Sequence, residues 1–114
     1  MKSLTLENFE EKALRAKDHR VLKFYSDTCP LCVSLKKVME RLEKEYDNVS
    51  FYSINIDKEK DLSELFVKDG VPTLYYVYEN IIEEIPYPYE NPDRFSGYQE
   101  KELKKYLTSK VKNG

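Results

Sequence analysis

The sequence of 114 residues is 40% hydrophobic and 35% charged, and its formal net charge at pH 7 is −2. That length suits one folded domain over residues 1–114 and is too short for two hydrophobic cores. Charges of both signs are interleaved without a basic stripe for nucleic acid, and no stretch reaches the ~20 consecutive apolar residues of a membrane helix.

Acidic residues near the amino terminus bear on the expected location of the protein. Glu7, Glu10 and Glu11 interrupt any apolar segment there, which distinguishes this stretch from a signal peptide. We therefore expect a cytoplasmic protein, and we expect it to be a monomer. A targeting segment upstream of residue 1 would change the first of these expectations.

The same stretch predicts a first helix. Thr5 is a suitable N-cap, and the apolar residues after it share one helical face, namely Phe9, Ala13 and Leu14. Leu4 and Leu6 are expected in a short strand before this helix. Residues 17–20 are polar and predict a loop, in which His19 is a solvated residue rather than a catalytic base.

Residues 21–26 are mostly apolar and aromatic, which predicts a buried central strand. The strand leads to Cys29-Pro30-Leu31-Cys32, which contains both cysteines of the chain. A helix is expected from this motif onward, because the following apolar residues keep a helical spacing: Leu31, Leu35, Val38, Met39, Leu42 and Tyr46. Free N–H groups at a helix amino terminus stabilise a thiolate, so one sulfur can be the nucleophile while the other resolves the product.

Two cysteines at this spacing fit redox chemistry better than the other roles of cysteine. They cannot join distant parts of a fold as a structural disulfide. A zinc site needs about four ligands, and the chain has one histidine and no further cysteine. We therefore expect neither a metal nor another cofactor.

The remaining segments complete an α/β pattern. Residues 49–56 predict a second strand, and Asp57 is a suitable cap for a third helix. Residues 74–78 and 81–85 predict a hairpin, and a last helix follows Gly97. This order predicts a central mixed sheet of four to five strands flanked by about four helices.

The order of elements, with Cys-x-x-Cys opening the second helix and Val71-Pro72-Thr73 opening the hairpin, resembles the thioredoxin family over essentially the whole chain. The resemblance implies the thioredoxin fold. It also implies that Cys29 is the attacking thiolate and Cys32 the resolving thiol. A cis peptide bond before Pro72 is expected for the same reason.

Two further positions take a role from the resemblance. The backbone of Val71 would pair with the substrate like a short strand, together with Pro72. Gly97 matches the glycine before the last helix, where the chain returns to the rim of the active site. The implied partners are proteins that contain disulfides and a reductase such as thioredoxin reductase.

The sequence departs from the family pattern beside the cysteines. Thr28 replaces the usual tryptophan, and Pro30-Leu31 replaces the usual Gly-Pro. Lys23 and Ser53 occupy the positions of the family's buried carboxylate and its partner lysine. A buried lysine either loses its proton or stabilises a nearby thiolate, whereas a lysine that extends its amine to the surface does neither. Both interpretations of Lys23 remain open.

A second departure is the extra length around residues 85–92. Tyr87 and Tyr89 alternate with prolines there, which suggests a wall that recognises the substrate. The alternative is a solvated loop along the edge of the sheet.

The sequence as a whole predicts a dithiol oxidoreductase that reduces protein disulfides. A disulfide oxidant or isomerase is the alternative, because new residues around the cysteines shift the balance between thiolate and disulfide. A glutaredoxin-like protein is another alternative, since proline follows the first cysteine. A third is a binding module of the same fold that does not use its cysteines.

Overall fold

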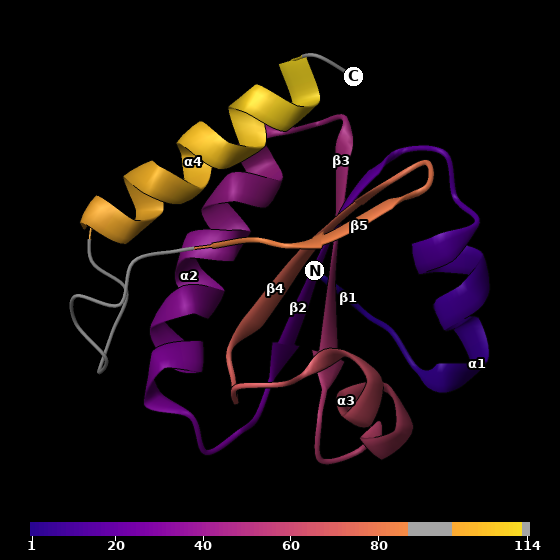
Figure 1. The fold of residues 1–114 in the computed structure, drawn as a ribbon. Coiled ribbons are helices and arrows are strands. Elements are labelled where there is room, and N and C mark those ends of the chain that lie inside the picture. The colour runs from indigo at the N-terminus through magenta and orange to yellow at the C-terminus, as the bar shows by residue number, and fades with distance from the viewer. Residues whose placement is uncertain (87–96, 113–114) are drawn as a thin grey trace.

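The protein is described here from a computed structural model, which places residues 1–86 and 97–112, the backbone alone at 97, 98 and 112. Its elements run in the order β1 (Lys2–Ser3), α1 (Leu6–Phe9), a π-helical turn η1 (Glu10–Leu14), β2 (His19–Tyr25), α2 (Pro30–Glu45), β3 (Val49–Asn55), α3 (Lys60–Phe66), β4 (Thr73–Tyr78), β5 (Ile81–Glu84) and α4 (Gly97–Lys112) (Figure 1). None of the helices within these ranges is long and apolar enough to cross a membrane.

The strands of the described residues form one five-stranded sheet in the order β1-β3-β2-β4-β5. β3 is parallel to β1 and β2, whereas β4 is antiparallel to β2 and β5. In the central strand, Val21 lies opposite Phe51 of β3 and Tyr76 of β4. The predicted mixed sheet is confirmed.

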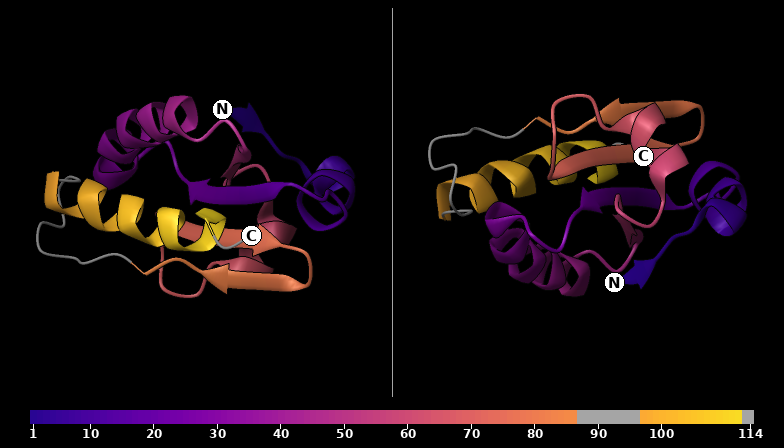
Figure 2. Two further views of the ribbon diagram at one scale, coloured as in Figure 1. Left: turned by 90° about the horizontal axis from the view of Figure 1, so that it is seen from above. Right: turned by 90° about the horizontal axis from the view of Figure 1, so that it is seen from below.

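Helices cover both faces of this sheet. α2 and α4 lie on one side and α1 and α3 on the other (Figures 1 and 2). The side of α2 and α4 buries a cluster that includes Val21, Leu35, Met39, Leu42, Leu103 and Leu107. The opposite side buries Phe9, Leu22, Phe24, Ile54, Leu62 and Val77. β2 therefore contributes to the buried clusters on both faces of the sheet, because its side chains alternate between the faces.

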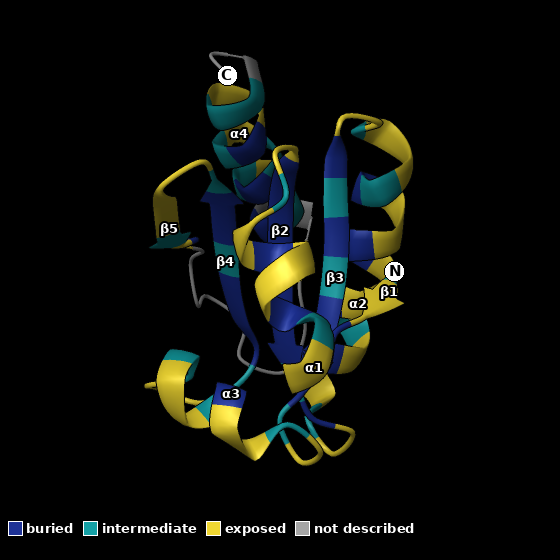
Figure 3. Cartoon of the chain, turned by 90° about the vertical axis from the view of Figure 1, so that its right-hand side faces the viewer, coloured by how far each residue is buried: buried dark blue, intermediate teal, exposed yellow. Residues whose placement is uncertain are grey.

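The central strands are buried along most of their length, while the outer surfaces of the helices are exposed (Figure 3). α2 follows its predicted pattern closely. Five of the residues on its predicted apolar face are buried, namely Leu31, Leu35, Val38, Met39 and Leu42, whereas Val33 on another face is exposed. The helix ends where the Tyr46 N–H donates to the carbonyl of Leu42 at 2.9 Å.

Several predictions about the first residues were wrong. The first strand is Lys2–Ser3, and Leu6 is exposed in α1. The π-helical turn changes the spacing of the side chains after Phe9, and Leu14 remains 38% exposed. Further along the chain, α3 starts at Lys60 with Glu59 as its N-cap, not at Asp57.

The predicted loop at residues 17–20 is confirmed for Lys17 and Asp18 but wrong for His19 and Arg20, because β2 already starts at His19. His19 is 6% exposed, and its Nδ1 lies 2.6 Å from the Tyr76 hydroxyl. Its ring also stacks on Tyr78, with ring centroids 4.0 Å apart. Pairing with β3 and β4 extends the strand through polar residues that carry no local strand signal.

Candidate active site

The two cysteines lie where β2 gives way to α2. Cys29 is the N-cap of α2, with extended φ and ψ of −93° and 112°, and Pro30 opens the helix. The backbone N–H of Cys32 donates to the sulfur of Cys29 at 3.1 Å. The free end of the helix therefore stabilises negative charge on the Cys29 sulfur, as the sequence predicts.

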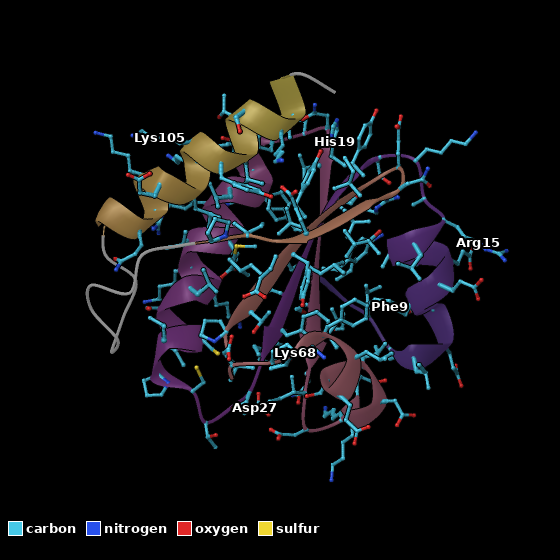
Figure 4. All side chains as sticks on the ribbon, in the orientation of Figure 1. Phe9, Arg15, His19, Asp27, Lys68 and Lys105 are labelled. Atoms are coloured by element: carbon cyan, nitrogen blue, oxygen red, sulfur yellow. The ribbon has the colours of Figure 1, made fainter. Side chains whose placement is uncertain are left out.

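Several polar contacts hold the segment that leads to Cys29. The Ser26 hydroxyl lies 3.1 Å from that of Thr28 and accepts from the Thr28 N–H at 3.3 Å. The Cys29 N–H donates to the Ser26 carbonyl at 3.4 Å. The Asn55 side chain donates to Asp27 at 3.4 Å, and Figure 4 shows Asp27 at the end of the sheet where α2 begins.

The segment before β4 brings Val71 to Cys29. The Cys29 Sγ lies 3.7 Å from the carbonyl oxygen of Val71, and the Val71–Pro72 bond is cis. The Thr73 hydroxyl donates to the Gly70 carbonyl at 2.6 Å, and Gly70 adopts a φ of 95° that favours glycine. Residues 42 positions apart in the sequence are thus in contact at the site.

The second cysteine differs from the first in its surroundings. Cys32 is 4% exposed, whereas Cys29 is half-buried. Burial, followed by the hydrogen bond with Cys29, raises the pKa of Cys32 to about 12. Cys32 is therefore a thiol at neutral pH, while the Cys29 sulfur is the more accessible one.

Lys23 lies inside the fold, with 3% of the residue exposed. Its role in tuning the cysteines stays a prediction. Nζ lies 5.0 Å from the centroid of the Tyr25 ring. Lys23 and Cys32 line one cavity of about 430 Å³, which Ser53 also lines. Burial lowers the pKa of Lys23.

Gly97 is the first residue of α4, so its predicted place beside the last helix agrees with the backbone. Its role toward a substrate stays a prediction. Tyr87 and Tyr89 lie outside the described residues, and so does most of the stretch 86–92. Within residues 1–86 and 97–112, no three or more His, Cys, Asp or Glu residues group closely enough to hold a metal ion.

Two contributors to the site escaped the sequence analysis. Ser26 holds Thr28 and Cys29 through three hydrogen bonds. Its position just before the motif was the only indication of this role in the sequence. Lys36 lines the same cavity as Cys32. The sequence could have predicted this position, because Lys36 follows Cys32 by four residues and residues four apart lie on the same face of a helix.

Comparisons with known proteins agree with this geometry. The family model described as Thioredoxin matches residues 1–109. A thioredoxin of Borreliella burgdorferi is 30% identical over 68% of this chain and 67% of its own length. Glutaredoxin-3 of Mus musculus is 28% identical over 95% of this chain, and the match spans 30% of that protein.

A putative protein disulfide-isomerase of Dictyostelium discoideum is 32% identical over 68% of this chain, a match that spans 19% of that longer protein. A solved structure from a study of thiol resolution in a yeast mitochondrial 1-Cys peroxiredoxin superposes with a TM-score of 0.77. It covers 96% of this chain and 94% of its own at 19% identity, which shows the fold. The matches and the Cys-x-x-Cys pair support a thiol-disulfide oxidoreductase. The chain belongs to the thioredoxin family.

Proposed function

We propose that this protein reduces disulfides of other proteins with the dithiol of Cys29 and Cys32. One observation carries the proposal: the Cys29 sulfur is half-buried at the N-cap of α2, accepts the Cys32 N–H and touches the carbonyl of Val71. Such a sulfur is accessible and supported as an anion, and an extended substrate can pair with the chain beside it.

The proposed reaction has two steps. The Cys29 thiolate attacks a substrate disulfide, forms a mixed disulfide and releases the first substrate thiolate. The Cys32 thiol then loses its proton and attacks the Cys29 sulfur, which releases the second substrate thiolate. The substrate gains two electrons, and Cys29 and Cys32 end as a disulfide.

Regeneration of the Cys29 and Cys32 thiols requires two electrons from a second partner. We propose a reductase of the thioredoxin reductase class for this role and a reducing compartment such as the cytoplasm as the location. Proteins with accessible disulfides are the proposed substrates. Gly97 is the proposed further contact at the rim of the site.

Reduction of insulin by dithiothreitol, followed by turbidity, tests the proposal. The wild-type protein should accelerate the reaction, and Cys29→Ser should abolish the acceleration. Reduced Cys32→Ser, freed of dithiothreitol and then mixed with insulin, should keep a mixed disulfide that gel electrophoresis without reductant detects. Lys37→Met, an exposed change on α2, should behave like the wild type. Equal rates for wild type and Cys29→Ser would refute the proposal.

A disulfide oxidant or isomerase is the second candidate, favoured by the match to a protein disulfide-isomerase. Equilibration of the Cys29/Cys32 pair with glutathione distinguishes a reductase from an oxidant or isomerase. A reduction potential near about −270 mV fits a reductase, and one near about −180 mV fits an isomerase.

A further inference from the structure

A row of polar side chains crosses the face of the sheet that α2 covers. Lys23 of β2 lies opposite Ser53 of β3, and Ser53 lies opposite Ser3 of β1. Residues paired in this way share one face of a sheet. Val21, two residues before Lys23, lies on the same face and packs in the cluster that α2 covers (Figure 1). The row therefore places polar groups where the next inward residue of β2 is apolar.

This row lines the cavity beside Cys32. The cavity has a volume of about 430 Å³, and small-molecule sites occupy about 300–1,000 Å³. Four residues of its lining are more than nine-tenths buried, namely Lys23, Ser26, Cys32 and Ser53. The buried part of the lining thus holds one amine, two hydroxyls and one thiol, and no carboxylate.

The Lys23 amine faces this cavity without a hydrogen-bond acceptor. Burial lowers its pKa, and the ionisable groups that act on it after burial line the cavity as well, namely Cys32, Lys36 and Glu40. Among residues 1–86 and 97–112, the amine forms no hydrogen bond or ion pair, and its recorded contact is the Tyr25 ring at 5.0 Å. An ammonium has three N–H donors, and it is costly to leave them without acceptors in a buried place.

The hydroxyl of Ser53 is a second donor without a partner. Ser53 is 8% exposed, and its side chain forms no hydrogen bond within the described parts of the chain. The register of β2 and β3 puts this side chain next to that of Lys23. A hydroxyl beside an ammonium suits an oxyanion, because each oxygen of the anion accepts more than one hydrogen bond.

The carboxylates of the lining belong to exposed residues. Asp27 and Glu40 are exposed, and Asp27 also accepts a hydrogen bond from Asn55 at 3.4 Å. Lys36 is an exposed cation of the same lining and opposes their charge. Water and salt screen exposed charges more strongly than buried ones. The charge of Lys23 therefore acts most strongly on a ligand inside the cavity.

We propose that this cavity binds a small oxyanion, the carboxylate or phosphate group of a small molecule, between the Lys23 amine and the Ser53 hydroxyl. The anion supplies the acceptors and the negative charge that these side chains lack. A small molecule suits the site better than a protein segment, because both side chains are more than nine-tenths buried. The site needs no disulfide chemistry, so its binding test is independent of insulin reduction.

An amide NMR titration of the reduced protein measures this binding. Sodium phosphate and sodium acetate are the probes. Sodium chloride at the same ionic strength is the blank, because it screens charge without offering oxygen acceptors. The amide signals of Lys23, Ser26 and Ser53 should shift along a saturating curve with at least one probe. Tighter binding of phosphate assigns a phosphate ligand, and tighter binding of acetate assigns a carboxylate ligand.

Lys23→Met removes the amine and keeps the length of the side chain. We expect it to weaken binding of the better probe by about tenfold or more, because hydrogen bonds to charged groups are stronger than neutral ones. Ser53→Ala removes one neutral donor and should weaken binding by about threefold. Lys37→Met removes an exposed charge of α2 outside the lining and should change the dissociation constant by less than about twofold.

Either of two results would overturn the site. The absence of saturating shifts with both probes would mean that the cavity holds no oxyanion. Equal dissociation constants for wild type, Lys23→Met and Lys37→Met would place the bound anion elsewhere on the protein. Lys23→Gln provides the same comparison if circular dichroism shows that Lys23→Met does not fold.

Discussion

Arg20 is a buried charge whose removal should stabilise the protein. It lies in β2 with 0% exposure, and Nε and both terminal nitrogens have no hydrogen-bond partner among the described residues. Burial lowers the pKa of Arg20, and the nearby Asp18 carboxylate opposes that shift. Arg20→Met keeps most of the volume of the side chain and removes the charge.

The expected increase in the free energy of unfolding follows from the burial of Arg20 without hydrogen-bond partners. A buried polar group without a partner costs about 1–3 kcal/mol, and the attraction of Asp18 offsets part of the cost for a charged one. We therefore expect Arg20→Met to raise the free energy of unfolding by about 1–3 kcal/mol. In a domain of this size, each kcal/mol raises Tm by about 3–6 °C.

Urea unfolding followed by circular dichroism measures this change, with Tm as a second readout. Arg15→Met is the matched control, because Arg15 is 75% exposed and pairs with Glu10. Its effect should stay within about 0.5 kcal/mol. A lower free energy of unfolding for Arg20→Met would mean that the Arg20 guanidinium forms stabilising contacts in the folded protein, and it would refute this prediction.

Two further predictions concern titration and reactivity. Burial lowers the pKa of His19. As pH falls below about 6.5, the unfolded chain therefore binds a proton at His19 before the folded protein does. The free energy of unfolding then decreases by up to about 1.4 kcal/mol per pH unit. His19→Phe keeps a ring against Tyr78 and should lose less stability between pH 7 and 5 in urea unfolding; an equal loss would contradict this origin. Iodoacetamide at neutral pH should label half-buried Cys29 well before Cys32, as peptide mass spectrometry would show, and equal labelling would contradict the assigned roles.

Local patterns were sufficient for much of the fold and for the centre of the site. The apolar spacing from Leu31 to Leu42 marked α2, because a helical face repeats within a few residues. The motif at the start of that helix placed Cys29 at a free helix end, where the structure has it as the N-cap. Strand-favouring runs likewise indicated the central strands.

Tertiary structure decided what depends on pairing between distant segments. The contact of Cys29 with Val71 joins residues 42 positions apart, and the sequence suggested it only through resemblance to a family. Pairing with β3 and β4 drew polar His19 and Arg20 into β2 and buried them, against their local character. The burial of Lys23 beside Cys32 was likewise set by packing of α2 over the sheet. A sequence carries its periodicity within each segment, whereas burial of a single polar side chain depends on which segments come to cover it.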